Sequence, residues 1–174
     1  MHIVEQARRL ARYEWLERRL FEIVGAWSAG DADAEAVRVF ATQARHHGWR
    51  AGMWSELTPV LHDVDRATVG PTLAAVEAMD AFASLGSTVE RSTALANTVL
   101  PTLQRRYDTE LEGSNPVADA PVIRVLQLLS LDAKQDWGAA AQLHRSVVRT
   151  EEDKERAAAT QSWLEVLLLP CWEV

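Results

Sequence analysis

Two short polar stretches interrupt segments that are otherwise apolar at helical spacing: Gln43-Ala44-Arg45-His46-His47 and Asp132-Ala133-Lys134-Gln135-Asp136. Projection at about 100° per residue places Gln43 at the centre of the inner stripe of its helix, with His46 and His47 on either side. The same projection places Asp132 and Asp136 on the inner stripe of the later helix. Polar groups that face a core need a partner, a metal or water. We therefore expect the two stretches to meet in one buried polar layer.

The sequence around these stretches is helical in its periodicity. In the first predicted helix, apolar side chains recur at spacings of three and four from Tyr13 to Trp27, as one face of a helix requires. Similar patterns continue to the C-terminus, and no strand-like alternation stands out. The expected helices cover about residues 3–28, 32–57, 71–85, 88–112, 119–148 and 151–168.

Turn and capping residues set the expected ends of these helices. The turn at Ser28-Ala29-Gly30-Asp31 ends the first helix and offers Asp31 as the next N-cap. Pro71 opens a short helix, and Ser87-Thr88-Val89-Glu90 forms a capping box for the helix that follows. Thr150 is an N-cap followed by acidic residues. Pro101 lies inside the helix over 88–112 and is expected to kink it.

The order of these helices predicts an all-α fold. Two helices form a hairpin, a crossover carries a short helix, a second hairpin follows, and an extra helix ends the chain. Residues 58–70 are expected to be an irregular connection. We expect a single domain over residues 1–174, because no stretch rich in proline, glycine and serine divides the chain.

Composition narrows the classes of function. The chain has 174 residues and a formal net charge of −7, which argues against binding nucleic acid through phosphate contacts. No apolar run is long enough to cross a membrane, and the N-terminus does not resemble a signal peptide. A single cysteine, Cys171, fits a reducing compartment, so we expect a cytoplasmic protein. Arginine greatly outnumbers lysine, which suggests a GC-rich bacterial genome.

Further charged side chains are expected in the polar layer. Glu17 projects close to the centre of the inner face of the first helix, and Glu14 lies nearer its edge. Arg50 lies on the stripe of Gln43 and is predicted to pair with Glu14, Glu17 or Asp132.

The two neighbouring histidines are expected to differ. We predict that His46 is a core histidine bonded to Glu14 or Gln43, and that His47 is partly exposed. The helix over 88–112 has no carboxylate at the matching height, which falls near Leu103.

On these residues the chain resembles the ferritin-like superfamily of di-iron carboxylate proteins, whose four-helix bundles carry one Glu on each of two helices and Glu-x-x-His on the other two. Within that superfamily it resembles bacterial ferritin-like proteins that are related to the tRNA-modifying di-iron hydroxylases. The resemblance implies that Glu17 or Glu14 stands for the first Glu and that His46 keeps its role. Gln43 stands where the family has a Glu, and Gln135 stands where it has a His. Asp132 stands where the family has the longer Glu.

Three functions stay open at this point. The first is a degenerate, metal-free bundle that acts as a binding or interaction protein, with a homodimer formed through tryptophan-bearing helix faces. The second is an oxygenase or hydroxylase that holds iron or manganese. The third is a carrier of a small apolar ligand. Two carboxylates and one imidazole are too few for two hard cations, which favours the first and leaves an enzymatic role uncertain. The candidate metal ligands are Glu14, Glu17, His46 and Asp132, and the remaining members of the polar layer are Gln43, His47, Arg50, Gln135 and Asp136.

Overall fold

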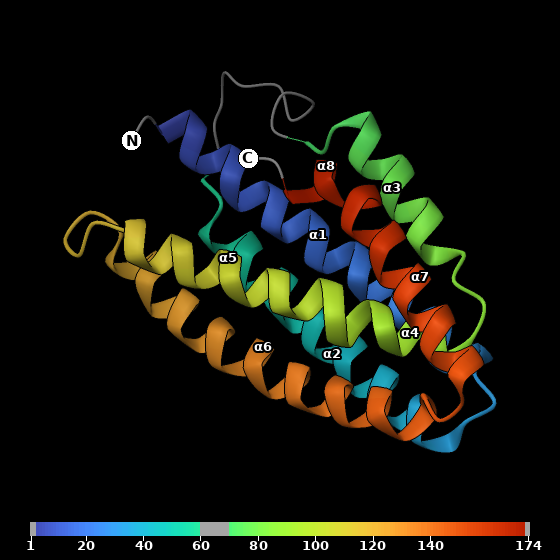
Figure 1. The fold of residues 1–174 in the computed structure, drawn as a ribbon. Coiled ribbons are helices and arrows are strands. Elements are labelled where there is room, and N and C mark those ends of the chain that lie inside the picture. The colour runs from blue at the N-terminus through green and yellow to red at the C-terminus, as the bar shows by residue number, and fades with distance from the viewer. Residues whose placement is uncertain (1–2, 60–69, 173–174) are drawn as a thin grey trace.

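The computed structural model describes residues 3–59 and 70–172, and its regular elements there are all helices (Figure 1). The expectation of an all-α fold is therefore confirmed. The helix bounds lie close to the predicted ranges, except that a short helix after residue 168 was not foreseen. The elements are α1 (Ile3–Gly30), α2 (Ala34–Leu57), α3 (Leu73–Ala83), α4 (Thr88–Thr93), the π-helix η2 (Ala94–Val99), α5 (Leu100–Gly113), α6 (Ala120–Val147), α7 (Glu151–Leu167) and α8 (Leu169–Trp172).

Four long helical segments lie side by side (Figure 1). Helix α1 packs along α2, α5 packs along α6, and α2 also contacts α6. Between α2 and α4 the chain returns to the far end of the molecule by way of α3, so α2 and α5 run in the same direction. Helix α3 packs on α7 and α8. Most of the connection predicted over 58–70 lies outside the described residues.

The first turn differs from its prediction. Asp33, not Asp31, caps α2, because its carboxylate accepts from the backbone amides of Glu35 and Ala36. Asp31 instead accepts from the hydroxyl of Thr88 at 2.8 Å and pairs with Arg91 at 3.1 Å. Asp31 therefore ties the end of the first hairpin to the start of α4.

Two other predicted caps are confirmed. The Ser87–Glu90 capping box begins α4, and Thr150 caps α7 in a second capping box, with Asp153. Pro71 lies before the first turn of α3 and not within it. The N-cap of α3 is Thr72, whose hydroxyl accepts from the backbone amide of Ala75.

The chain accommodates Pro101 by widening the turn before it. The amide of Leu100 donates to the carbonyl of Leu95, five residues back, so this turn is a π-helix. The carbonyl of Ala96, which Leu100 would serve in an α-helix, instead accepts from the indole N–H of Trp137 on α6 at 2.8 Å. A cross-helix bond thus replaces the one that Leu100 no longer makes to Ala96.

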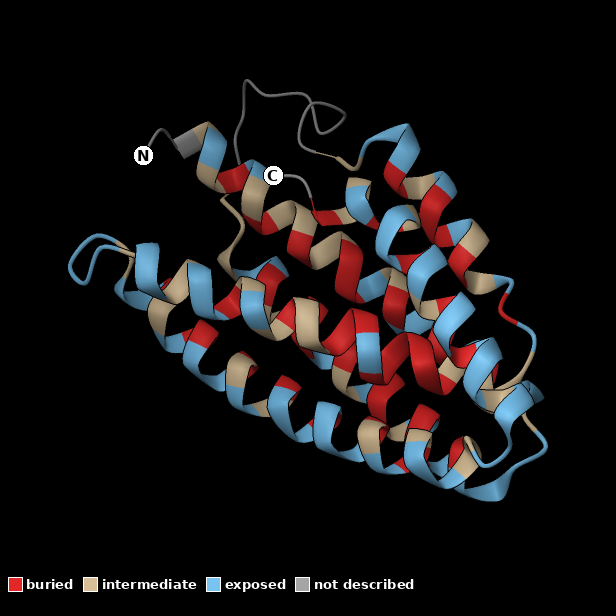
Figure 2. Ribbon diagram, in the orientation of Figure 1, coloured by how far each residue is buried: buried red, intermediate tan, exposed pale blue. Residues whose placement is uncertain are grey.

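Buried residues line the facing sides of the long helices (Figure 2). At one level of this core, Tyr13, Trp54 and Tyr107 form an aromatic cluster, with the rings of Tyr13 and Trp54 stacked at 4.9 Å. Within the described part of the chain, no helix combines the length and apolar character that crossing a membrane requires.

Candidate functional site

The centre of the predicted polar layer is Arg50, whose side chain on α2 is fully buried. Its Nε donates to Glu17 on α1 at 3.0 Å, and its Nη1 donates to Asp136 on α6 at 2.8 Å and also to Asp132. The predicted pairing with Glu17 and Asp132 is therefore present in the structure. One guanidinium bonds three carboxylates from two other helices. These bonds connect α1, α2 and α6 at one level of the bundle.

Glu17 is the most enclosed carboxylate of this cluster. It accepts from Arg50, from the Nδ1 of His47 at 2.5 Å, and from the hydroxyl of Tyr107 on α5. Burial alone would raise the pKa of Glu17, but Arg50 and His47 outweigh this effect, so the pKa lies below its usual value. Glu17 is therefore an ionised, fully hydrogen-bonded carboxylate at neutral pH.

His47 is fully buried, which corrects the prediction that it is partly exposed. Its Nδ1 lies 2.5 Å from Glu17 and 2.8 Å from the Nη2 of Arg50, and it cannot both donate to the carboxylate and accept from the guanidinium. The shorter contact identifies Nδ1 as a donor. Burial and the charge of Arg50 lower the pKa of His47, so the ring is neutral. Its buried Nε2, which has no hydrogen-bond partner among the described residues, carries a lone pair.

His46, Asp132 and Asp136 form the outer edge of the cluster. The Nδ1 of His46 lies 2.8 Å from Asp136 and 3.9 Å from Asp132, and the side chains of His46 and Asp132 are partly exposed. His46 therefore contacts Asp136 and not the predicted Glu14 or Gln43. Gln43 is buried and donates to the backbone carbonyl of Asp136 at 2.9 Å, while its Oε1 has no hydrogen-bond partner in the part of the chain that the structure describes.

Two residues predicted to face inward do not join this cluster. Glu14 lies at the surface and pairs with Arg18 at 2.6 Å, so Glu17 alone represents α1. Gln135 is exposed. The inner stripe of α6 passes through Ala133 and Asp136, and at about 100° per residue Gln135 projects away from that stripe.

Sequence reasoning missed the contribution of α5. Tyr107 follows Leu103 by one helical turn on the same buried stripe, and its hydroxyl donates to Glu17 and accepts from the indole of Trp54 at 3.3 Å. The signal in the sequence is a tyrosine four residues after Leu103, which marks the level where a carboxylate is expected. The apolar ring of a tyrosine fits the stripe of a core helix, so periodicity alone does not indicate that its hydroxyl serves the polar cluster.

The cluster does not fit a di-iron centre. The carboxylates that would bridge or hold iron already bond to Arg50, and the guanidinium lies between them. Manganese prefers the same oxygen donors and meets the same obstacle. The described ligand atoms that do come together, one each from His46, Asp132 and Asp136, lie within 4.8 Å of one another at the edge of the cluster. That set suits a single ion at most.

Comparison of the chain with protein-family models, with curated proteins and with solved structures found no match.

Proposed function

We propose that this chain is a degenerate ferritin-like protein that acts as a binding or interaction protein, without di-iron chemistry. The observation that carries the proposal is the position of Arg50. Its buried guanidinium occupies the space between Glu17, Asp132 and Asp136, where a bundle of that superfamily holds its metal pair.

Charge supports this proposal. A unit positive charge about 4 Å from the guanidinium costs about 4 kcal/mol at an effective dielectric constant of about 20. A pair of divalent cations would meet this repulsion several times over and would compete for carboxylates that Arg50 already holds. The fixed organic cation therefore replaces the structural role of metals and leaves no redox centre.

The arrangement of the helices is consistent with the family assignment. Two helical hairpins are joined by a crossover that includes α3, so α2 and α5 run in the same direction (Figure 1). Ferritin-like folds have one such long crossover connection. With the metal function lost, what remains is a rigid helical scaffold whose faces and recesses can bind partners.

A second candidate function is favoured by the outer edge of the cluster. His46, Asp132 and Asp136 present one imidazole and two carboxylates at a partly exposed position, a ligand set that suits a single Zn²⁺, Mn²⁺ or Fe²⁺ ion. This mononuclear site would still face Arg50, which bonds both carboxylates.

Metal analysis separates the two candidates. Protein equilibrated with Fe²⁺, Mn²⁺ or Zn²⁺ and then dialysed is expected to retain far less than one ion per chain. His46→Ala should not alter this result, and His144→Ala, in the last turn of α6 and away from the cluster, serves as the control. Retention of about one ion that is lost only in His46→Ala would establish the mononuclear site. Retention of about two ions per chain would overturn the proposal.

A further inference from the structure

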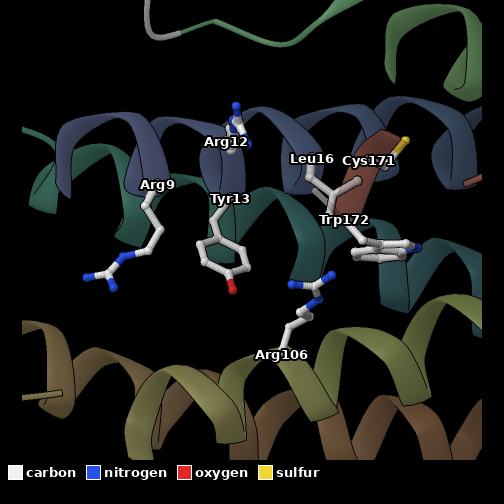
Figure 3. Close-up of a pocket in the computed structure, with 7 residues that line it drawn as sticks. All are labelled: Arg9, Arg12, Tyr13, Leu16, Arg106, Cys171 and Trp172. Atoms are coloured by element: carbon white, nitrogen blue, oxygen red, sulfur yellow. The ribbon is translucent and has the colours of Figure 1, made fainter. Parts of the chain in front are cut away.

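A shallow recess, open to solvent, lies between α1, α5 and α8 (Figure 3). Its apolar lining includes Leu16 and the indole of Trp172. Its cationic lining includes Arg9 from α1 and Arg106 from α5, which lie on either side of Tyr13 in Figure 3. The full lining is Arg9, Arg12, Tyr13, Leu16, Arg106, Cys171 and Trp172.

Arg9 and Arg106 differ in how they meet the acidic groups that the structure describes. Arg9 pairs with Glu110 through Nη1 at 2.9 Å, while its buried Nη2 has no hydrogen-bond partner among the described residues. No hydrogen bond or ion pair within 4.0 Å joins the guanidinium of Arg106 to another described residue. Among the described residues, Glu110 is thus a carboxylate on which both guanidinium groups act.

Neutral donors and apolar surface adjoin these charges. Figure 3 shows the Tyr13 ring and the Arg106 guanidinium extending toward the same space from α1 and α5, with the indole of Trp172 beside the guanidinium. Burial and the charge of Glu110 raise the pKa of Tyr13, so its hydroxyl keeps its proton. Its bond to Glu110 is long, at 3.5 Å. The recess therefore offers hydrogen-bond donors next to an apolar wall.

We propose that this recess binds a small organic carboxylate, with the carboxylate on Arg106 and the apolar part of the ligand against Leu16 and Trp172. A guanidinium presents a planar fork of donors that matches a carboxylate, and this pairing is strengthened where the site is partly withdrawn from water. The apolar wall favours an organic acid over inorganic phosphate or sulfate. This names a ligand class for the binding role proposed above, but it rests on residues that the Arg50 cluster does not use.

Calorimetric titration of metal-free protein tests this site with hexanoate, acetate, hexanol and inorganic phosphate. We expect hexanoate to bind, acetate to bind more weakly, and hexanol and phosphate to bind weakest. Arg106→Gln should lower the association constant of hexanoate by about tenfold or more, because it removes a charge-assisted pair. Arg105→Gln, an exposed arginine one position away, is the matched control and should change nothing.

Two further measurements keep the result decisive. Arg106→Lys should retain part of the binding, and the circular dichroism of each variant shows whether it is folded. The proposal is overturned if hexanoate does not bind, if Arg106→Gln binds it like Arg105→Gln, or if hexanol or phosphate binds as tightly as hexanoate. A metal-retaining protein would defeat the non-redox proposal and leave this titration unaffected, so the two failures are distinguishable.

Discussion

Two arginine sites in this molecule, to both of which α1 contributes side chains, differ in the number of carboxylates that bond the guanidinium. Arg50 is fully buried and bonded to three carboxylates, so it is enclosed on every side by the protein. Arg106 borders an open recess and has no ion pair among the described residues. The number of acidic partners therefore decides whether a guanidinium holds helices together or remains available to a ligand.

The largest effect is expected at the enclosed site. Arg50→Met should lower the free energy of unfolding by about 3–5 kcal/mol, because it leaves buried carboxylates without their cation. Urea denaturation followed by circular dichroism measures this loss. Arg45→Met, an exposed arginine on the same helix, is the control and should cost well under about 1 kcal/mol. Equal effects of the two variants would show that the buried pairs do not hold the helices together.

A smaller effect is expected from the hydroxyl that α5 brings to Glu17. Tyr107→Phe should cost about 1.5–3 kcal/mol, the usual value of a hydrogen bond to a charged group. Tyr13→Phe is the matched change at the recess, where the bond to Glu110 is long, and should cost clearly less. The same denaturation experiment compares them. If Tyr13→Phe is the more damaging variant, the ranking of the two sites is wrong.

The pH dependence of stability tests the neutral state assigned to His47. Its pKa is lowered in the folded chain, so the unfolded chain takes up a proton first as the pH falls below about 6.5. The stabilisation from His47 is therefore present above about pH 6.5 and decreases as the pH falls toward its folded pKa. The difference in unfolding free energy between wild type and His47→Gln should shrink from pH 7.5 to pH 5.5. A difference that is independent of pH would mean that His47 titrates normally.

The two sites also differ in how much of them the sequence predicts. Glu17, Gln43, Arg50 and Asp136 were placed correctly in the interior, because each lies within one helix whose apolar residues fix the direction of the core. His46 and His47 are adjacent, about 100° apart, and the prediction exchanged their exposure. Which neighbour turns inward depends on how α2 rotates against α1, and packing between helices decides that.

Analogy between the two polar stretches was a weaker guide than projection. The ferritin-like resemblance implies that Gln135 stands at an inner ligand position three residues after Asp132, but Gln135 is exposed and Asp136 takes the inner position. Neither helical projection nor the family resemblance predicts the recess. The recess is lined by residues of α1, α5 and α8, and α8 was not predicted. The pattern within a single helix therefore cannot indicate that Arg106 and Trp172 line the same recess.

The smallest effect is expected from Arg106 itself, and it gives the sharpest test of the contrast. Arg106→Gln should change the free energy of unfolding by no more than about 0.5 kcal/mol, because the side chain has no ion pair with any described residue. Arg9→Gln, in the same recess, removes the pair with Glu110 and should cost about 1 kcal/mol. Urea denaturation of both variants without added carboxylate measures the difference. A cost for Arg106→Gln equal to that of Arg9→Gln would make Arg106 a structural residue like Arg50. A negligible cost, together with lost hexanoate binding, would leave ligand recognition as the reason that a partly buried charge lies there at all.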